Sequence, residues 1–378
     1  MRYLIAIDSG GTKTDTVLFD ETGHILCRDL SPGANGMDIG KSEAVRRILA
    51  VLDRVTVQAP EKVSAIYGGI AGVMPLGDFY SEAVLPQNYA PSVRFDDDGP
   101  SIISAAIGHQ DGCGMVVGTG CSCFIRIEGQ PLRKVGGKGY LIDTGGSGFE
   151  LGRDALMMAF RATDGRCPNT ALVELVEAQM GVPVERWMEK IYDPVKGGRP
   201  FIASFAHNVF KARAMGDWAA MEIFDRGAHL LGDLTHAAAK WFDGEFPVAM
   251  NGGLVMNFPE YTEAIRKASH PRARMIPSAA PPVYGAAVEA MWDVGLEADD
   301  AFRQRFLAEN AATEKKTCPL PSPGPVISPR RSSSKSAFTW KTPSSGGKKN
   351  EKGVRSFETY SDPFYGPAAL GYDRRPGQ

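Results

Sequence analysis

The chain opens with short runs of apolar and polar positions that predict strands. Residues 2–8 (RYLIAID) form an apolar run typical of a buried strand, and residues 14–20 (TDTVLFD) indicate a second strand by their alternation. The turn residues 21–23 lead into a third strand at 24–30. The pattern therefore predicts an antiparallel opening of three strands.

The spacing of apolar positions then changes to that of a helix and afterwards returns to that of strands. Residues 41–57 carry apolar positions at helical spacing. The strands expected at Met115–Gly118 and Cys123–Ile127 repeat the opening of the chain, which indicates a second domain built in the same way. The expected elements after the first helix are strands at 62–71 and Val93–Asp96, a helix at Ser101–Ile107, and strands at Met115–Gly118 and Cys123–Ile127.

From 147 to 243 the pattern is almost entirely helical, and we expect Trp187, Trp218 and Trp241 on faces that point into the core. Residues 247–250 form a short strand, and helix, strand and helix follow to about residue 310. Strands that return among helices predict an α/β fold.

The composition changes at about residue 313. Segment 313–378 is rich in Pro, Ser and Gly and carries 12 Lys and Arg against 5 Asp and Glu. Such a segment cannot bury enough apolar area to offset its ordering entropy, which predicts a disordered basic tail. The rest of the chain is expected to divide into domains at 1–112 and 113–312.

The overall composition and the distribution of apolar residues limit the partners and the location that we expect for the protein. The chain has 378 residues, 43% of them hydrophobic, and a formal net charge of -2, so nothing in its overall charge indicates a nucleic-acid partner. No stretch approaches the roughly 18 apolar residues of a membrane span, and the N-terminal apolar run is too short for a signal peptide. We therefore expect no membrane partner and a cytoplasmic location.

A glycine-rich turn between the first two strands is a candidate phosphate site. Glycines let backbone N–H groups approach phosphate oxygens, and neighbouring hydroxyl and ammonium groups add donors. A carboxylate at the end of the first strand can hold Mg²⁺ through water. A tight hairpin without a ligand is the plainer alternative. The residues in question are Asp8, Gly10, Gly11, Thr12 and Lys13.

A second glycine turn lies between the second pair of strands. Gly118, Thr119 and Gly120 repeat the arrangement of the first turn in the other half of the chain. Two such loops could hold one nucleotide between two domains. A tight hairpin is again the alternative, and the pairing with the first loop favours the phosphate interpretation.

Three consecutive carboxylates, Asp96, Asp97 and Asp98, lie at a strand end before a helix. Phosphoryl transfer to a hydroxyl requires a base that orients the hydroxyl and accepts its proton. The same residues would also suit the N-terminal turn of a helix. Residue type alone leaves both interpretations open.

Taken in order, these motifs resemble those of the N-acetylglucosamine kinase and BadF-type ATPase family of the actin/hexokinase-like sugar kinase superfamily. The resemblance covers about residues 1–295 and implies a two-domain, ribonuclease H-like α/β fold with ATP in an interdomain cleft. It also implies the two phosphate loops, substrate binding by Asn35 and Gly36, sugar binding by Gly137, Lys138, Gly139 and Asp143, an adenosine loop at Gly252 and Gly253, and a closing helix from 282–287.

The resemblance implies ATP-dependent phosphorylation of an amino sugar, first of all N-acetylglucosamine, with glucosamine or an N-acetylmuramic sugar as further possibilities. The cofactors it implies are ATP and Mg²⁺, and the assembly is a homodimer. The family's catalytic Asp precedes an apolar helix by about four residues. Asp97 places Ser101 and Ile102 at that spacing, so it is the expected base and also a substrate contact.

Two residues differ from the family's pattern, and both lie in the loops that the resemblance assigns to sugar binding. Lys138 stands where Trp is frequent, and Thr144 stands where an acidic residue is usual. Both departures bear on the choice of sugar and not on the phosphate chemistry. Lys138 could pair with an acidic substituent such as the lactyl group of a muramic acid, or it could be a solvated surface side chain.

Two other functions are compatible with the resemblance. One is the ATPase that activates 2-hydroxyacyl-CoA dehydratases, which bridges an iron–sulfur cluster with Cys from two subunits. Cys121 and Cys123 lie inside the second phosphate loop region, and no Cys pair lies near Lys138. The other is a non-catalytic sugar sensor, against which the presence of Asp8 and Asp97 argues.

Overall fold

Two five-stranded sheets form the framework of the computed structural model. The structure describes residues 1–143 and 145–313. Thr144 and the predicted tail beyond residue 313 lie outside these residues. The α/β prediction is confirmed, whereas the boundary predicted between residues 112 and 113 stays a prediction.

The first sheet has the order β3-β2-β1-β4-β5. Strands β1, β2 and β3 pair antiparallel, as the opening pattern predicts, and β4 and β5 join in parallel on the other side of β1. A parallel connection needs a crossover, which the helices between β3 and β5 supply. The strands are β1 (Tyr3–Ser9), β2 (Lys13–Asp20), β3 (Ile25–Pro32), β4 (Ala65–Ile70) and β5 (Ser92–Asp96).

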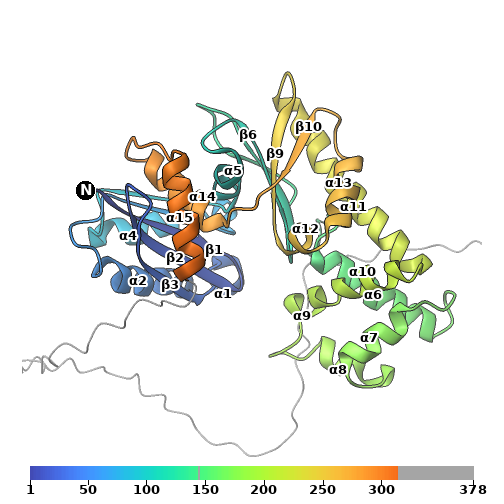
Figure 1. Cartoon of the computed structure of the whole chain (residues 1–378). Coiled ribbons are helices and arrows are strands. Elements are labelled where there is room, and N and C mark those ends of the chain that lie inside the picture. Colours follow the sequence, from blue (N-terminus) through green and yellow to red (C-terminus); the bar gives the residue numbers. More distant parts are fainter. Residues whose placement is uncertain (144, 314–378) are drawn as a thin grey trace, which may run out of the picture. The chain divides into compact units, whose positions relative to one another are not determined.

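Helices cover both faces of this sheet, which explains why β1 is apolar along its length. Ile5 and Ile7 belong to a core shared with α2 and α4, whereas Leu4 and Ala6 belong to a core shared with α14 and α15 (Figure 1). Successive side chains of a strand point to opposite faces, so a strand buried on both faces loses its polar alternation. The helices are α2 (Lys41–Thr56), α4 (Phe79–Val84), α14 (Pro282–Trp292) and α15 (Asp300–Thr313).

The second sheet has the order β10-β9-β6-β7-β8. It again combines an antiparallel hairpin, β6 with β7, and a parallel neighbour, β9. The short strand β8 was not expected from the sequence. The strands are β6 (Gly112–Val117), β7 (Cys121–Arg126), β8 (Arg133–Val135), β9 (Phe246–Asn251) and β10 (Ala273–Pro277).

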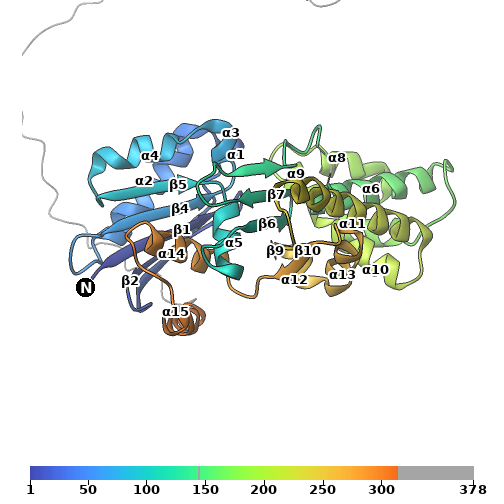
Figure 2. The same cartoon turned by 90° about the horizontal axis from the view of Figure 1, so that it is seen from above.

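The predicted helical region packs on one face of the second sheet, and α5 (Gly99–Ile107) lies on the other (Figure 2). A Cβ on Gly114 of β6 would lie 2.9 Å from Ile103 of α5, so glycine permits this close contact. The helices of the region are α6 (Gly148–Thr163), α7 (Leu172–Met180), η2 (Val184–Arg186), α8 (Trp187–Ile191), α9 (Arg199–Ser204), α10 (Ala206–Ala214), α11 (Trp218–Ala238) and η3 (Ala239–Trp241).

The prediction of three buried tryptophans is correct for one of them. Trp187 is buried in the core of the second sheet, whereas Trp218 is 40% exposed and Trp241 is 45% exposed. Trp218 begins α11 and donates its indole N–H to the carbonyl of Asn169, and Trp241 lies beneath the guanidinium of Arg133. The indole ring of tryptophan is apolar but carries a polar N–H group, so it can lie at the surface as well as in the core. Helical spacing therefore did not show whether these two tryptophans are buried.

The remaining helices connect the sheets or follow them. Because α14 and α15 come after β10 yet pack on the first sheet, the chain returns to its starting sheet. These helices are α1 (Gly36–Ile39), α3 (Val73–Leu76), η1 (Leu85–Gln87), α12 (Gly253–Asn257) and α13 (Pro259–Ala268).

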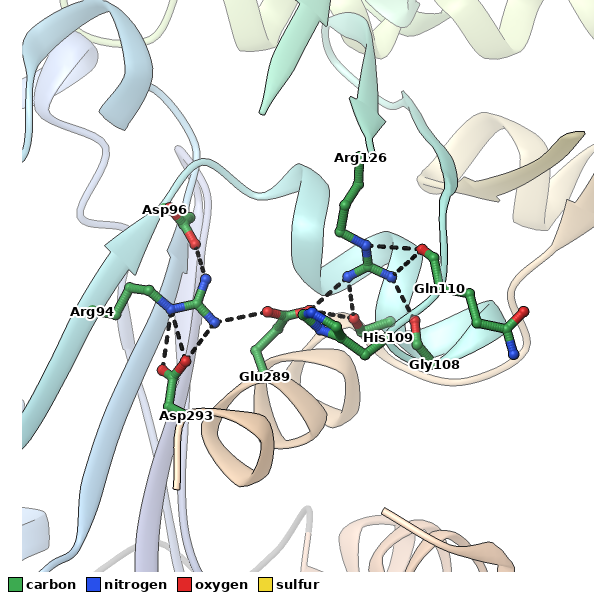
Figure 3. A network of polar contacts seen from close by, with 9 residues as sticks. Arg94, Asp96, Gly108, His109, Gln110, Arg126, Glu289 and Asp293 are labelled. Atoms are coloured by element: carbon green, nitrogen blue, oxygen red, sulfur yellow. Dashed lines mark hydrogen bonds and ion pairs between the residues drawn. The ribbon is translucent and has the colours of Figure 1, made fainter. Parts of the chain in front are cut away.

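Helices α5 and α14 cross at Gly285, where a Cβ would lie 1.7 Å from the carbonyl oxygen of Ser101. One turn further along α14, Glu289 is only 1% exposed. Arg94 of β5 donates to its Oε2 at 2.8 Å, and Arg126 of β7 donates to its Oε1 at 2.7 Å (Figure 3). One buried carboxylate therefore joins a strand of each sheet.

The environment of Glu289 favours its ionised form. Burial alone would raise the pKa of Glu289, but the neighbouring His109 and the guanidinium charges of Arg94 and Arg126 outweigh burial and lower the pKa to about 2. A carboxyl with a lowered pKa stabilises the folded state above its unfolded pKa, and this contribution disappears as the pH falls through the folded pKa.

We expect Glu289→Gln to lower the free energy of unfolding by about 3–5 kcal/mol at pH 7, because it leaves the largely buried guanidinium of Arg126 without its carboxylate, whereas Arg94 keeps its other carboxylate partners. The difference from the wild type should shrink as the pH falls from 4.5 towards about 2. Urea unfolding across this range measures it. Glu263→Gln, which changes an exposed i,i+3 pair with Arg266, is the matched control and should alter the midpoint little. A pH-independent difference would contradict the assignment.

Candidate functional site

The first glycine loop is the turn between β1 and β2. Gly10 N–H donates to the Lys13 carbonyl at 3.0 Å and closes the turn. No described residue accepts a hydrogen bond from the N–H groups of Gly11 and Thr12. The loop thus presents free backbone donors, which is the feature that a phosphate site requires.

Asp8 lies at the end of β1, directly opposite Asp15 on β2. Burial first, and then the charge of Asp15, raises the pKa of Asp8 to about 7, and the ammonium of Lys13 opposes this shift. Asp15 itself forms a buried ion pair with Arg28 at 2.6 Å. A cation at Asp8 would favour the ionised carboxylate.

The role of Asp8 in holding Mg²⁺ stays a prediction, and a single carboxylate would have to supply it. Within 1–143 and 145–313, no group of three or more His, Cys, Asp or Glu could hold a metal ion. Magnesium is usually bound by one or two carboxylates together with water and substrate phosphates, and not by an all-protein cage. A single carboxylate beside a phosphate loop fits that pattern.

The segment that carries Asn35 lies directly on the first loop. A Cβ on Gly33 would lie 2.4 Å from the carbonyl oxygen of Gly10, so only glycine allows the approach. Ala34 N–H donates to Ser9 Oγ at 3.0 Å. Asn35 then caps α1, because its Oδ1 accepts a hydrogen bond from Met37 N–H at 2.8 Å. Gly36 follows as the first, buried residue of that helix.

Asp97 is 1% exposed and is held by backbone donors from the loop after β4. Gly72 N–H donates to Oδ1 at 3.3 Å, Met74 N–H to Oδ2 at 3.2 Å, and Asp98 N–H to Oδ1 at 3.2 Å. A Cβ on Gly72 would also lie 2.6 Å from Asn35 Oδ1. The structure therefore brings Asp97 and Asn35 to the same glycine.

The three consecutive carboxylates differ in environment. Asp96 pairs with Arg94 and belongs to the network around Glu289. Burial, and then the charge of Asp97, raises the pKa of Asp98 well above its ordinary value, while Lys134 lowers it. Asp97 instead accepts hydrogen bonds from Gly72 and Met74, and Gly72 lies against Asn35.

Lys134 was missed by the sequence analysis. Its Nζ lies 3.5 Å from Asp97 Oδ2, and its side chain is 14% exposed. A Cβ placed on Gly137 would lie 3.0 Å from Lys134 Cε, and the Lys134 ammonium lies 4.7 Å from the ring centre of Phe124. Lys134 therefore connects the carboxylate on the first sheet to the predicted sugar loop. Nothing in its sequence neighbourhood distinguishes it from Arg133.

The predicted sugar loop is a tight backbone turn. Gly137 has φ +67° and lies against Ser122 and Lys134, positions that exclude a side chain. Asp143 Oδ2 accepts from Lys138 N–H at 2.8 Å, and Asp143 N–H donates to the Gly139 carbonyl at 2.9 Å. The side chain of Lys138 is exposed, and no described residue pairs with its ammonium.

The second glycine loop is fixed by α6. Gly118 N–H donates to the Gly120 carbonyl at 2.9 Å. The carbonyls of Gly118 and Thr119 accept from Gly148 N–H at 2.8 Å and from Ser147 Oγ at 2.9 Å. No described acceptor bonds the N–H groups of Thr119 and Gly120. The helix thus holds the carbonyls and leaves the donors free.

The predicted adenosine loop lies beside the second glycine loop. A Cβ on Gly252 would lie 2.4 Å from the Val117 carbonyl oxygen, one residue before Gly118. The parallel pairing of β6 and β9 brings both loops to the same sheet edge. Gly253 begins α12. An open pocket of about 460 Å³ adjoins the loop and is lined by Asn251, Met256, Ser278, Ala279, Ala280, Pro281, Leu307, Asn310 and Ala311.

Comparison with known proteins identifies the family of the chain. The sequence model of the BadF/BadG/BcrA/BcrD ATPase family matches residues 5–290. The chain belongs to this family. The resemblance stated from the motifs is thereby confirmed at the level of the family.

The chain is similar in sequence or structure to several known proteins. It is 27% identical over 310 residues to the N-acetyl-D-glucosamine kinase of Dictyostelium discoideum, covering 76% of this chain and 97% of that protein. It is 27% identical over 178 residues to the N-acetylmuramic acid/N-acetylglucosamine kinase of Clostridium acetobutylicum, covering 46% of this chain and 58% of that protein. A candidate N-acetylglucosamine kinase from Chromobacterium violaceum has a TM-score of 0.60 at 25% identity, covering 76% and 98%.

The predicted residues fall into two groups in space. Asp8 and its loop, Asn35 and Asp97 meet at the first sheet, whereas the loops at Gly118 and Gly252 meet at the second. Lys134 joins the first group to the sugar loop. None of the described helices is both long and apolar enough to cross a bilayer.

The contact between Lys134 and the carboxylates can be tested without a substrate. The ammonium lowers the pKa of Asp98 against burial, so Lys134→Met should raise that pKa further. Carbon NMR of the Asp98 carboxyl across a pH titration measures the change. Lys267→Met, at an exposed lysine of α13, should leave the titration unchanged. An identical titration in wild type and Lys134→Met would show that the ammonium does not lie at this site.

Proposed function

We propose that this chain transfers the γ-phosphoryl group of ATP to a hydroxyl of an amino sugar, first of all N-acetylglucosamine. The observation that carries the proposal is the environment of Asp97, a buried carboxylate held by backbone donors beside Asn35 and reached by Lys134. Similarity to the Dictyostelium discoideum kinase over 97% of that protein supports the choice of sugar.

The nucleotide would use both glycine loops. The free N–H groups of Gly11 and Thr12, and those of Thr119 and Gly120, provide donors for phosphate oxygens. Gly252 and Gly253 would lie at the adenosine. Asp8 would hold Mg²⁺ through water, and the ion when bound neutralises charge on the β- and γ-phosphates.

The acceptor would lie against the first sheet and the sugar loop. Asn35 and Asp143 would bind hydroxyls, and the backbone of 137–139 would contact the ring. Asp97 would orient the attacking hydroxyl and accept its proton. Its neighbour Asp98, whose pKa burial raises well above the ordinary value, lies next to this base.

The experiment that tests the function is a panel of sugars with ATP and MgCl₂, in which ADP and sugar phosphate are both measured. N-acetylglucosamine, glucosamine and N-acetylmuramic acid form the panel, with glucose as a neutral sugar without an amino group. Sugar phosphate equal to ADP supports the kinase. ADP release that no sugar stimulates would favour the activator ATPase, and nucleotide binding without turnover would favour a sugar sensor.

Asp97→Asn should reduce kcat for the preferred sugar by roughly 10²–10⁴-fold, the usual contribution of a positioned general base. Nucleotide affinity should persist because the base acts on the acceptor and not on ATP. Steady-state kinetics together with calorimetric titration of ADP separate the two effects.

Asp98→Asn is the matched control for this substitution. It replaces the carboxyl next to Asp97 by an amide of the same shape and leaves the backbone donors and Lys134 at Asp97 in place, so activity should stay close to the wild type. A large loss in Asp98→Asn with little loss in Asp97→Asn would move the assignment of the base to Asp98.

Lys138→Met tests whether the ammonium contributes to sugar choice. Because the Lys138 side chain is exposed, the change should leave kcat/KM for N-acetylglucosamine nearly unchanged. Kinetics with N-acetylmuramic acid provide the comparison. A selective loss of roughly 10- to 150-fold on the acidic sugar would match a charge-assisted hydrogen bond and show that Lys138 binds a carboxylate.

A further inference from the structure

Arg199, the first residue of α9, lies against the second glycine loop although it is far from it in sequence. Its Nη2 is 2.4 Å from the position that a Cβ on Gly120 would occupy. Its Cζ lies 5.2 Å from the ring centre of Tyr140, at the end of the predicted sugar loop. The guanidinium therefore occupies the space between the phosphate loop and the sugar loop, and glycine at position 120 makes room for it.

Among the described residues, the guanidinium has an aromatic neighbour in Tyr140 but no hydrogen-bonded acceptor. Its Nε is buried without a hydrogen-bond acceptor, and across 1–143 and 145–313 no carboxylate pairs with Arg199. A guanidinium has five donors and cannot lose its charge. A buried donor left unsatisfied costs free energy and calls for an explanation. An oxyanion bound at this position would supply the missing acceptors.

Helix α6 fixes the three parts of this arrangement with respect to one another. Its N-terminus bonds the loop through Ser147 and Gly148. In its first turn Phe149 packs edge-on against Tyr140, with ring centres 4.9 Å apart. One turn later, a Cβ on Gly152 would lie 2.0 Å from the Ile202 carbonyl, so α9 lies in direct contact with α6. One rigid element thus positions the loop, the ring beneath the guanidinium and the helix that carries Arg199.

The neighbouring carboxylates do not compete for the cation. Glu150 accepts from Ser147 N–H at 2.9 Å and from the Ser147 hydroxyl, and Asp143 accepts from Lys138 N–H at 2.8 Å. The N–H groups of Thr119 and Gly120 remain free beside the guanidinium. Free backbone donors next to an arginine fork match the three oxygens of a terminal phosphoryl group.

We propose that Arg199 binds the γ-phosphoryl group of the nucleotide, which makes it a binding residue of the transfer step that lies outside every motif noted in the sequence. The inference rests on the proposed kinase function for the identity of the nucleotide. Arg199 would distinguish a nucleoside triphosphate from a diphosphate, because only the triphosphate carries the group that it contacts.

Calorimetric titration with Mg²⁺ and either AMPPNP, an ATP analogue that is not hydrolysed, or ADP tests this assignment. Arg199→Gln should weaken AMPPNP binding roughly 10- to 150-fold, the range expected for charge-assisted hydrogen bonds, and should leave ADP binding nearly unchanged. Arg199→Lys keeps a charge but not the fork, so its loss should be intermediate. Arg213→Gln, which removes an arginine 4.0 Å from the Phe224 ring, is the matched control and should bind both nucleotides as the wild type does.

Equal AMPPNP affinity in wild type and Arg199→Gln would overturn the inference, as would equal losses for ADP and AMPPNP in a variant whose melting temperature is unchanged. A loss confined to an acidic sugar would also overturn it and assign Arg199 to the acceptor. The outcomes separate from those of the proposed function. A wild type that binds AMPPNP through Arg199 but phosphorylates no amino sugar would contradict only the acceptor, and a wild type that binds neither nucleotide would contradict both proposals.

Discussion

The carboxylate of Glu289 is the interaction on which the arrangement of the two sheets depends. It lies in α14, beyond the point where that helix crosses α5, and it binds Arg94 from the first sheet and Arg126 from the second. Removing a charge from water is costly, so a buried carboxylate is stable only while both guanidinium groups stay in place. The same strand that supplies Arg94 ends immediately before Asp97, and the position of the candidate base is therefore tied to this network.

Close backbone contacts, more than side-chain packing, shape the loops of the site. Gly33 lies on Gly10, and Gly252 lies on Val117, each at a distance that a Cβ would prevent. These contacts bring segments far apart in the sequence next to one another, while no described residue accepts a hydrogen bond from the N–H groups of Gly11, Thr12, Thr119 and Gly120. A glycine in these positions is thus required by the neighbouring backbone, whatever ligand the loop binds.

This dependence on local backbone explains how much the sequence predicted. Alternation and glycine turns are local signals, so most strands and both loops follow from them, and the family is confirmed. The expectation that Trp218 and Trp241 are buried was wrong, because helical spacing does not show which face meets another element. Lys134 and Arg199 escaped notice for a related reason: each acquires its meaning from a residue more than 30 positions away, and neither belongs to a recurring motif.

The two sides of the site differ in what constrains them. At the second glycine loop, the N-terminus of α6 bonds the loop carbonyls and fixes the backbone. At the predicted sugar loop, Asp143 closes the turn through Lys138 N–H, and the Lys138 side chain is exposed. A side chain at that position can change without disturbing the turn, because only its backbone is bonded. Lys138, at which the chain departs from the family pattern, lies at this position, so the departure leaves the backbone of the predicted sugar loop intact.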